Sequence, residues 1–182
     1  MPKTFPVPCT KEEMDKILEA ASEDDFFYML FKVARKTGRR LGEYHDVQVK
    51  DVDFDLKIMK TKVLKRRQRI EKDAILDDEL VYLIKSYVQR SRLKLDDYLF
   101  RKVGYRQIQN RIKSYAKKAG ITHVVSFHNF RHYFVTELFK KGWTYDKIAK
   151  LTGHSSPGVL ASYDHTVATD LAMEAREDIR NI

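Results

Sequence analysis

Apolar residues recur every three or four positions in several stretches of this chain, the spacing of an α-helix with one buried face. The first stretch follows Thr10, and Glu13 three residues later completes the sequence of a capping box. The second is strongly apolar, beginning near Asp24 and ending at Thr37–Gly38, where glycine suits a helix C-terminus. Later helices are expected from Asp77, from Tyr105 to Ala119, from His128 to about Lys141 and from Trp143 to about Thr152.

The pattern changes between Val47 and Leu76, where apolar residues alternate in places with charged ones in the manner of β-strands. Two or three short antiparallel strands are expected there. A basic connection lies between them, since six of the ten residues from Lys60 to Arg69 are Lys or Arg. The predicted fold class is therefore mainly α with a small antiparallel β-sheet, an α+β arrangement.

Three segments are expected along the chain. Residues 1–9 include three prolines and are predicted to form a linker-like N-terminal segment. Residues 10–165 are predicted to form one domain, because 182 residues are enough for a single substantial core. Residues 166–182 carry an apolar stripe and are predicted to form a tail helix.

Composition narrows the class of partner. The chain has 35 Lys and Arg against 26 Asp and Glu, a net charge of +9, which favours a polyanion such as nucleic acid. No apolar run is long enough to span a bilayer, and no signal peptide is recognised. The single cysteine excludes an intramolecular disulfide framework and fits a reducing compartment, so a cytoplasmic protein is expected.

One predicted helix presents two phosphate-binding side chains together. His128 and Arg131 are three residues apart, so they project from the same face. With Arg40 upstream, two arginines could hold the non-bridging oxygens of a phosphodiester through paired hydrogen bonds. The Tyr163 hydroxyl is a candidate nucleophile, but its ordinary pKa of about 10 requires help from nearby positive charge or a base such as His128.

The remaining steps need a proton donor and a further phosphate ligand. Lys65, in the basic connection, is the candidate acid for the leaving 5′ oxygen, with Lys62 or Lys60 as alternatives. His154, in the segment Leu151–Ser156, could donate another hydrogen bond to the phosphate. Because side chains supply all the cations, neither a metal nor another cofactor is expected.

Each of these residues also has a structural interpretation. Tyr163 is one of ten tyrosines, and taken alone it is better explained as a half-buried structural side chain. Arg40 could pair only with Glu43, and the basic run from Lys60 to Arg69 could be a solvated hairpin. The functional interpretation depends on all of them occurring together and in order.

A metal site at the predicted helix was also considered. His128 and His132 have the i, i+4 spacing of a zinc pair. The glutamate that a metalloprotease motif requires after the first histidine is replaced by Asn129, and the chain has no cysteine cluster. No metal site is therefore expected.

Three motifs together resemble a known family. Thr37–Glu43 resembles the first-arginine box of the tyrosine recombinases, and His128–His132 resembles their His-x-x-Arg box. Leu151–Ser156, with Tyr163 nine residues after the histidine of this segment, resembles their last box and nucleophile. The chain is similar over nearly its whole length to the C-terminal catalytic domain of a phage-integrase-type or Xer-like recombinase. Gly42 stands where the family often has serine, and the basic style of the hairpin looks archaeal.

The resemblance implies a mechanism. Tyr163 would attack the scissile phosphate, leaving a 3′-phosphotyrosyl link and a free 5′-hydroxyl, and a 5′-hydroxyl of another strand would reverse the reaction. The other implied catalytic residues, which hold the phosphate or protonate the leaving oxygen, are Arg40, Lys65, His128, Arg131 and His154.

The resemblance also implies the partners. Double-stranded DNA would be bound with the help of basic residues in the first box and the hairpin, namely Arg39, Lys62, Arg66, Arg67 and Arg69. Family members act as tetramers on DNA, so a homo-oligomer is expected on DNA and a monomer alone, with residues 166–182 packing on a neighbour or on their own domain. Most members also carry an N-terminal DNA-clamping domain, so the chain is interpreted as a catalytic fragment or a minimal recombinase. Delivery of Tyr163 in cis or in trans stays open.

Three alternatives remain. The chemistry is shared with type IB topoisomerases, which rejoin the same strand. A non-catalytic DNA-binding module of the same fold would also fit, although the intact set of site residues argues against it. A helical regulator is the third, because the short helices between Trp143 and Tyr163 could imitate a helix-turn-helix.

Overall fold

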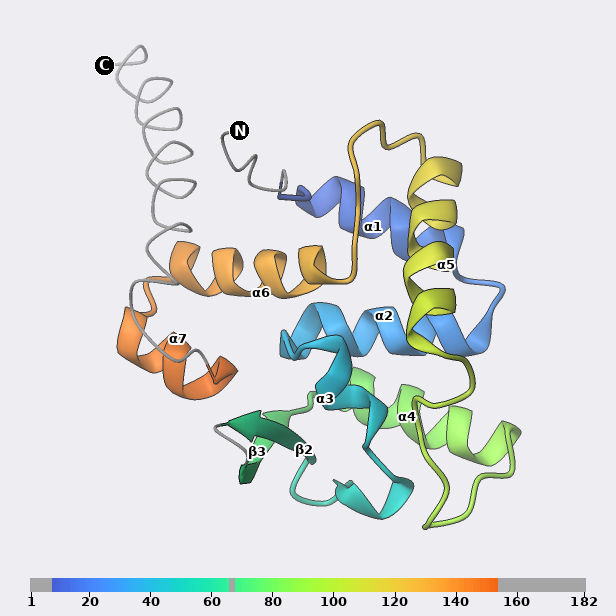
Figure 1. Ribbon diagram of the computed structural model, residues 1–182, viewed down its shortest axis with the longest axis vertical. Helices are drawn as coiled ribbons and strands as arrows, with labels where there is room; N and C mark the ends of the chain where they lie inside the picture. The colour runs from blue at the N-terminus through green and yellow to red at the C-terminus, as the bar shows by residue number, and fades with distance from the viewer. Residues whose placement is uncertain (1–7, 66–67, 154–182) are drawn as a thin grey trace. The chain divides into compact units, whose positions relative to one another are not determined.

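The computed structural model describes residues 8–65 and 68–153, apart from the side chains of residues 63–65 and 68–70 (Figure 1). His154, Tyr163 and the predicted tail helix lie outside the described residues. The chain divides into two compact units, Met1–Tyr133 and Phe134–Ile182, and the boundary falls inside helix α6 (His128–Lys140). The single domain predicted for residues 10–165 stays a prediction.

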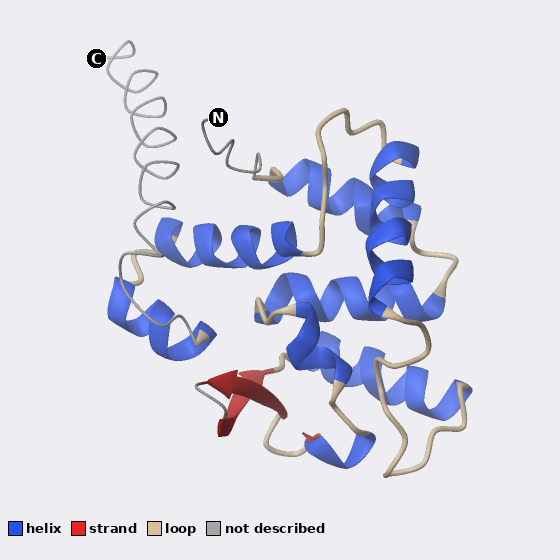
Figure 2. Ribbon diagram, in the orientation of Figure 1, coloured by secondary structure: helices blue, strands red, loops and turns tan. Residues whose placement is uncertain are grey.

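The described elements are mostly helical, with one small sheet (Figure 2). The fold class predicted from the alternation pattern is thus confirmed. The first unit contains, in chain order, α1 (Lys11–Ala20), α2 (Asp25–Thr37), α3 (Leu41–His45), η1 (Val49–Asp51), β1 (Val52–Asp53), β2 (Ile58–Lys65), β3 (Gln68–Ile75), α4 (Asp78–Arg90) and α5 (Tyr105–Lys118).

The predicted capping signals act at the starts of the first two helices. The Thr10 N–H donates to Glu13 Oε2 at 2.9 Å, and Thr10 Oγ1 accepts from the Glu13 N–H at 3.2 Å. Asp24 Oδ1 accepts from the N–H groups of Phe26 and Phe27, each at 3.2 Å. These bonds satisfy backbone donors that a helix N-terminus otherwise leaves unpaired.

The sheet has the order β1-β2-β3 with antiparallel pairing throughout. Its main part is the β2–β3 hairpin, in which Ile58 pairs with Ile75 and Lys65 with Gln68. The stretch that begins at Val47 has fewer residues in β-strands than its alternating apolar pattern predicted. Val49–Asp51 forms a 3₁₀ turn and β1 is only two residues long, and Gln48 just before the turn forms an isolated antiparallel bridge with Tyr98.

Helix α2 provides the centre of the first core. It packs against α1 and α4, and its aromatic face is fully buried. Phe31 stacks on Phe130 with ring centroids 5.2 Å apart, and Phe27 meets Tyr115 edge-on at 5.8 Å. Burying a phenylalanine side chain contributes about 1.5–3 kcal/mol, so these contacts fix the start of α6 and the helix α5 on α2.

The second unit, as far as it is described, is built by the part of α6 that begins at Phe134 and by α7 (Tyr145–Thr152). Val135 and Ile148 are its fully buried apolar residues, and Phe139 meets Tyr145 with centroids 4.9 Å apart. Gly153 has a φ of 75°, a left-handed conformation that ends α7.

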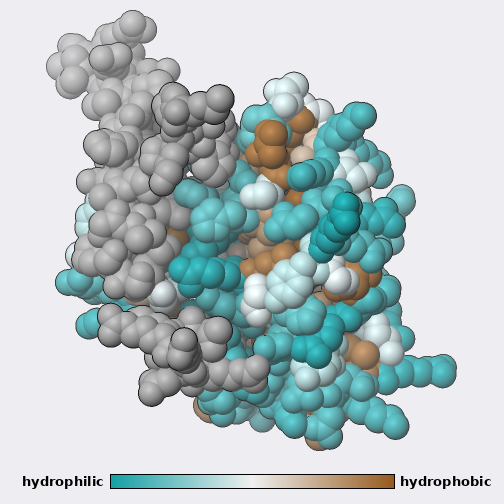
Figure 3. All heavy atoms as spheres, in the orientation of Figure 1, coloured by the Kyte–Doolittle hydropathy of each residue, from teal (hydrophilic) through white to brown (hydrophobic). Residues whose placement is uncertain are grey.

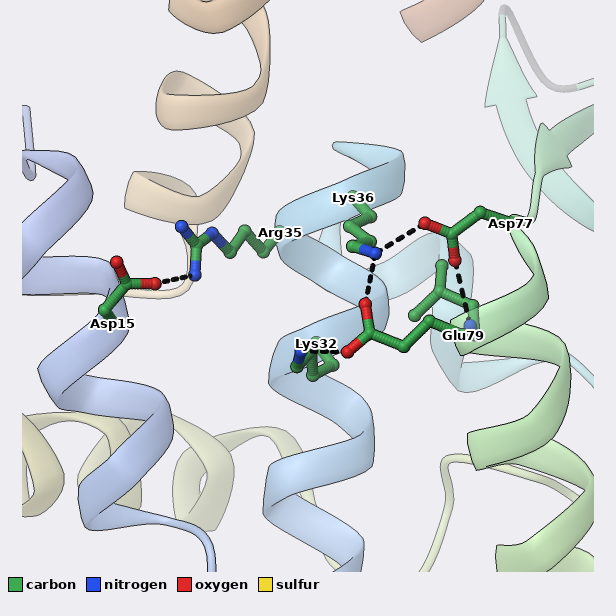
Figure 4. A network of polar contacts seen from close by, with 7 residues as sticks. Asp15, Lys32, Arg35, Lys36, Asp77 and Glu79 are labelled. Atoms are coloured by element: carbon green, nitrogen blue, oxygen red, sulfur yellow. Dashed lines mark hydrogen bonds and ion pairs between the residues drawn. The ribbon is translucent and has the colours of Figure 1, made fainter.

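The outer face of α2 carries ion pairs rather than apolar contacts (Figure 4). Lys32 and Lys36 both bind Glu79 of α4, and Lys36 also binds Asp77. The face seen in Figure 3 is mostly hydrophilic, with apolar side chains in smaller patches between the charged ones. Among the described helices, none is both long and apolar enough to cross a bilayer.

Candidate active site

Arg40 begins α3 directly after the turn that ends α2. Gly38 takes the left-handed conformation, with φ of 60°, and reverses the chain. The Arg40 N–H then donates to Glu43 Oε2 at 3.3 Å, and Arg40 Nη1 donates to Glu43 Oε1 at 3.1 Å. The Arg40 side chain stays 45% exposed while that of Glu43 is 6% exposed. The ion pair with Glu43 that the structural interpretation of Arg40 predicted is therefore present, and it holds the Arg40 guanidinium at the surface.

Arg39 is not at the surface, which corrects its assignment as a DNA-binding residue. It is 1% exposed, and its Nη2 donates to the carbonyl oxygen of Asp73 on β3. Nε and Nη1 have no hydrogen-bond partner among the described residues. Burial lowers the pKa of this guanidinium, although Glu43 and Tyr44 partly oppose the effect. Arg39 thus joins the first-arginine segment to the hairpin from inside the fold.

The start of α6 is anchored by aromatic residues on either side of His128. Phe127 and Phe130 are buried, and Phe127 meets Tyr44 with centroids 5.7 Å apart. Asn129 Oδ1 accepts from the Ser126 N–H at 2.9 Å, which closes the first turn. His128 is consequently left exposed.

Arg131 connects the two arginine segments. It is 1% exposed, and its Nη1 donates to the carbonyl oxygen of Gly38 at 2.9 Å. Gly38 lies two residues before Arg40, so the start of α6 is held against the turn that carries the other arginine. The first unit therefore brings Arg40, His128 and Arg131 together, although they are separated by 91 residues of sequence at most.

The electrostatics of His128 reflect this convergence. Although part of the ring contacts solvent, burial of the rest is the largest cause that lowers its pKa below 6.5, followed by the charges of Arg131 and Arg40. The imidazole is therefore neutral near pH 7. It can accept a proton from a hydroxyl, whereas the sequence alone left open whether it would bind phosphate as a cation.

His132 is a neighbour of His128, and its sequence position alone suggested only a role as a metal ligand. The two rings meet edge-on with centroids 4.7 Å apart. Burial, His128 and Arg131, in that order, lower the pKa of His132 to about 4. The i, i+4 spacing of His128 and His132 on one helix indicates that the two rings lie side by side.

The hairpin carries the candidate lysines at different depths. Lys65 is the last residue of β2 and pairs with Gln68, the first residue of β3. Lys60 is exposed and Lys62 half-buried, whereas Thr61 is fully buried and its Oγ1 donates to the Lys72 carbonyl at 2.8 Å. Arg66, Arg67 and the side chains of Lys65 and Arg69 lie outside the described part of the chain.

The described residues end just before the last predicted motif. Helix α7 leads to Gly153, and His154 and Tyr163 follow outside the described ranges. The structure thus bears on three of the six predicted catalytic side chains, namely Arg40, His128 and Arg131.

Comparison with known proteins gives a consistent result. Residues 9–169 match the Phage integrase family. Tyrosine recombinase XerA of Pyrococcus furiosus is 27% identical over 195 residues, which cover 100% of this chain and 66% of XerA. Tyrosine recombinase XerC of Natranaerobius thermophilus is 26% identical, with 85% of this chain and 56% of XerC covered.

Solved structures show the same fold. A crystal structure of XerA recombinase matches 97% of this chain and 66% of its own, with a TM-score of 0.81 and 28% identity. XerH site-specific recombinase, in a post-cleavage complex with its palindromic difH substrate, matches 94% of this chain and 53% of its own, with a TM-score of 0.78 and 20% identity. The chain spans about two thirds or less of the length of these relatives.

Proposed function

The chain belongs to the phage integrase family, and we propose that it is the catalytic domain of a site-specific DNA recombinase that cleaves DNA with Tyr163. The observation that carries this proposal is the hydrogen bond from Arg131 to the Gly38 carbonyl. It places one buried arginine against the turn that presents the other, next to a neutral histidine. That arrangement suits a phosphodiester better than it suits a structural core.

Phosphate binding falls to the two arginines. Arg40 stays at the surface, where DNA can reach it, and Arg131 is fixed from behind by Gly38. A phosphate that gains charge in the transition state is stabilised most by donors already in place, because they need no reorganisation during the reaction. The ion pair with Glu43 limits the freedom of Arg40 in the same way.

Nucleophile activation falls to His128. A tyrosine hydroxyl must lose its proton to attack phosphorus, and the neutral imidazole is able to take it. The lowered pKa of His128 sets the sign of the pH dependence. Cleavage should be retained at neutral pH and lost as the pH falls through this pKa, below 6.5. His154 would donate a further hydrogen bond to the phosphate.

The leaving 5′ oxygen would receive its proton from Lys65. Lys65 is preferred because it is the last residue of β2, whereas Lys60 and Lys62 lie farther back along the same strand. The same hairpin, through Lys62, Arg66, Arg67 and Arg69, is proposed to bind DNA.

The proposed partners follow from this role. The duplex would be bound by a homo-oligomer, with four copies on two DNA segments, in the cytoplasm. The related XerH site-specific recombinase, bound to its palindromic difH substrate in a post-cleavage complex, supports a cleavable recombination site as the substrate class. Since the relatives are longer, full clamping of DNA is proposed to require more protein than this chain.

The test uses a supercoiled plasmid in EDTA, with wild type and Tyr163→Phe side by side. Wild type should relax the plasmid and leave protein on the 3′ end after SDS trapping, whereas Tyr163→Phe should do neither while binding DNA equally well. Adduct formation by Tyr163→Phe would contradict the assignment of the nucleophile. A type IB topoisomerase-like activity would give relaxation but no joint molecules from two labelled duplexes.

A further inference from the structure

Three side chains with metal-binding groups converge outside the proposed active site. Cys9 lies just before α1, Glu13 is in its first turn, and His123 belongs to the connection between α5 and α6. One ligand atom from each residue lies within 4.8 Å of the others. All three residues belong to the first unit. No motif in the sequence connects them.

The contacts inside this cluster leave donor atoms unused. Glu13 Oε1 and His123 Nε2 are 3.0 Å apart, while Glu13 Oε2 caps α1 through the Thr10 N–H. The Nδ1 atom of His123 is buried and has no hydrogen-bond partner among the described residues. Cys9 is 5% exposed. A buried imidazole nitrogen without a partner is unfavourable, and a metal ion is a partner that its lone pair can bind.

We propose that Cys9, Glu13 and His123 form a binding site for a zinc-class divalent cation, which joins the start of α1 to the connection before α6. A thiolate, a carboxylate and an imidazole are the donors that Zn²⁺ prefers, whereas Mg²⁺ and Ca²⁺ prefer oxygen donors alone. Three protein ligands leave one tetrahedral position for water. This site is separate from the residues proposed for the phosphodiester chemistry.

The geometry requires only a local adjustment. Bonds to zinc of about 2.0–2.3 Å place tetrahedral ligands roughly 3.3–3.8 Å apart. The ligand atoms lie within 4.8 Å of one another, so shifts of about 1 Å would bring them to this spacing. Binding through the buried Nδ1 of His123 would give that nitrogen a partner, whereas binding through Nε2 would replace the hydrogen bond to Glu13.

Proton balance fixes how the site depends on pH. Burial, with Glu13 as the second cause, raises the pKa of the Cys9 thiol to about 12, so without a metal the thiol stays protonated. Binding would form the metal–sulfur bond and release that proton to solvent. The titratable groups in contact with the site are Glu13 and His123, and each must also be unprotonated to bind. Affinity should therefore rise with pH.

The site contacts the proposed active site through one residue. A side-chain hydrogen bond joins Cys9 to Asn129, which lies between His128 and Arg131 in the sequence. Because Asn129 Oδ1 accepts from Ser126, its amide NH₂ is the group that can donate to the sulfur. A metal-bound thiolate would be a stronger acceptor than a thiol, so cation binding should hold the first turn of α6 more firmly.

Cobalt titration tests the proposal directly. Cys9 is the only cysteine in the chain, so any cobalt–thiolate charge-transfer band must come from it. Wild type at pH 8 should bind one Co²⁺ per chain with this band and with the strong visible absorption of a tetrahedral site, and one equivalent of Zn²⁺ should remove both. Cys9→Ser should lose the band, and His123→Gln should weaken Co²⁺ binding at least tenfold.

A matched control separates this site from adventitious binding. His45→Gln removes another half-buried histidine, whose Nδ1 is 3.6 Å from Asp46 but which has no thiol beside it. This variant should bind Co²⁺ as wild type does. The thermal midpoint of wild type should also rise with Zn²⁺, by more at pH 8 than at pH 6, and His123→Gln should lose the rise.

Two results would overturn the proposal. One is folded wild type, checked by circular dichroism, that shows no thiolate band at one equivalent of Co²⁺. The other is Zn²⁺ raising the thermal midpoint equally in wild type and His123→Gln, which would locate the binding elsewhere, for instance at His128 and His132. The His123 variant carries the test if Cys9→Ser does not fold.

Discussion

Two charged regions meet helix α2 and differ in how their charges are balanced. On its outer face, Lys36 binds both Asp77 and Glu79, and these contacts raise the pKa of the lysine, although burial opposes them. At its C-terminal end, burial lowers the pKa of His128, and the charges of Arg131 and then Arg40 lower it further. In the first region each charge stabilises its neighbour. In the second, Arg40 pairs with Glu43, but two arginines lie beside a histidine that stays neutral.

This difference indicates which region is structural and which is functional. Opposite charges in contact satisfy one another, so the α2–α4 network needs no ligand. Cations held together are unfavourable in the free protein and become favourable when an anion binds between them. A phosphodiester is such an anion, and its binding should raise the pKa of His128. The predictions below test the contrast, from the largest expected effect to the smallest.

Arg131→Ala should give the largest change. The loss of one donor placed at developing charge lowers a cleavage rate by about 10²–10³-fold. The control is Arg35→Ala, which removes an arginine of α2 that pairs with Asp15 and contacts Tyr133. Single-turnover cleavage of a labelled duplex measures both. Equal losses in the two variants would remove the distinction between the regions.

Replacement of the proposed general acid, Lys65, should give the next largest effect on cleavage. Lys65→Ala should slow cleavage by about 10²-fold, the usual contribution of a general acid. Lys60→Ala and Lys62→Ala serve as matched controls on the same strand and should stay within a few-fold of wild type. A substrate whose leaving atom is a 5′ sulfur needs no proton and should restore the Lys65 variant. Rescue of Lys62→Ala instead would move the acid to that residue.

The sequence predicted the helices, their caps and the hairpin because short-range signals determine them. The capping box at Thr10 and the left-handed Gly38 are examples. It did not predict the burial of Arg39, since nothing in the local sequence distinguishes it from Arg40. Only the three-dimensional path of β3 brings the Asp73 carbonyl to its guanidinium.

The candidate site also combines residues that local motifs predict with contacts that only the folded chain creates. The motif spacing identified Arg40, His128 and Arg131, and the structure brings them together through the Arg131–Gly38 bond. The cluster of Cys9, Glu13 and His123 was not predicted, because its members are separated by up to 114 positions and belong to no motif. Long-range convergence of this kind is a property of packing, and it has no signal in the local pattern.

Acid should weaken the fold through His132. Its pKa is about 4 in the folded chain, against 6.5 as its ordinary value, so the unfolded chain binds more protons between these pH values. Stability is therefore complete above pH 6.5 and declines as the pH falls toward 4, by roughly 1–2 kcal/mol. His132→Gln should flatten this part of the curve. Urea unfolding at several pH values measures it, and an unchanged slope would contradict the prediction.

The α2–α4 network should give the smallest effect. Hydrogen bonds from Lys32 and Lys36 lower the pKa of Glu79 to about 2, so its contribution is present above 4.5 and is lost as the pH falls toward 2. The Glu79 side chain is 50% exposed, and solvent screening reduces such pairs to about 0–1 kcal/mol. Glu79→Gln should therefore lower the free energy of unfolding by less than about 1 kcal/mol, with a smaller difference at high salt. It should leave DNA cleavage unchanged. A loss of cleavage comparable to that of Arg131→Ala would mean that the balanced network, too, belongs to the functional region.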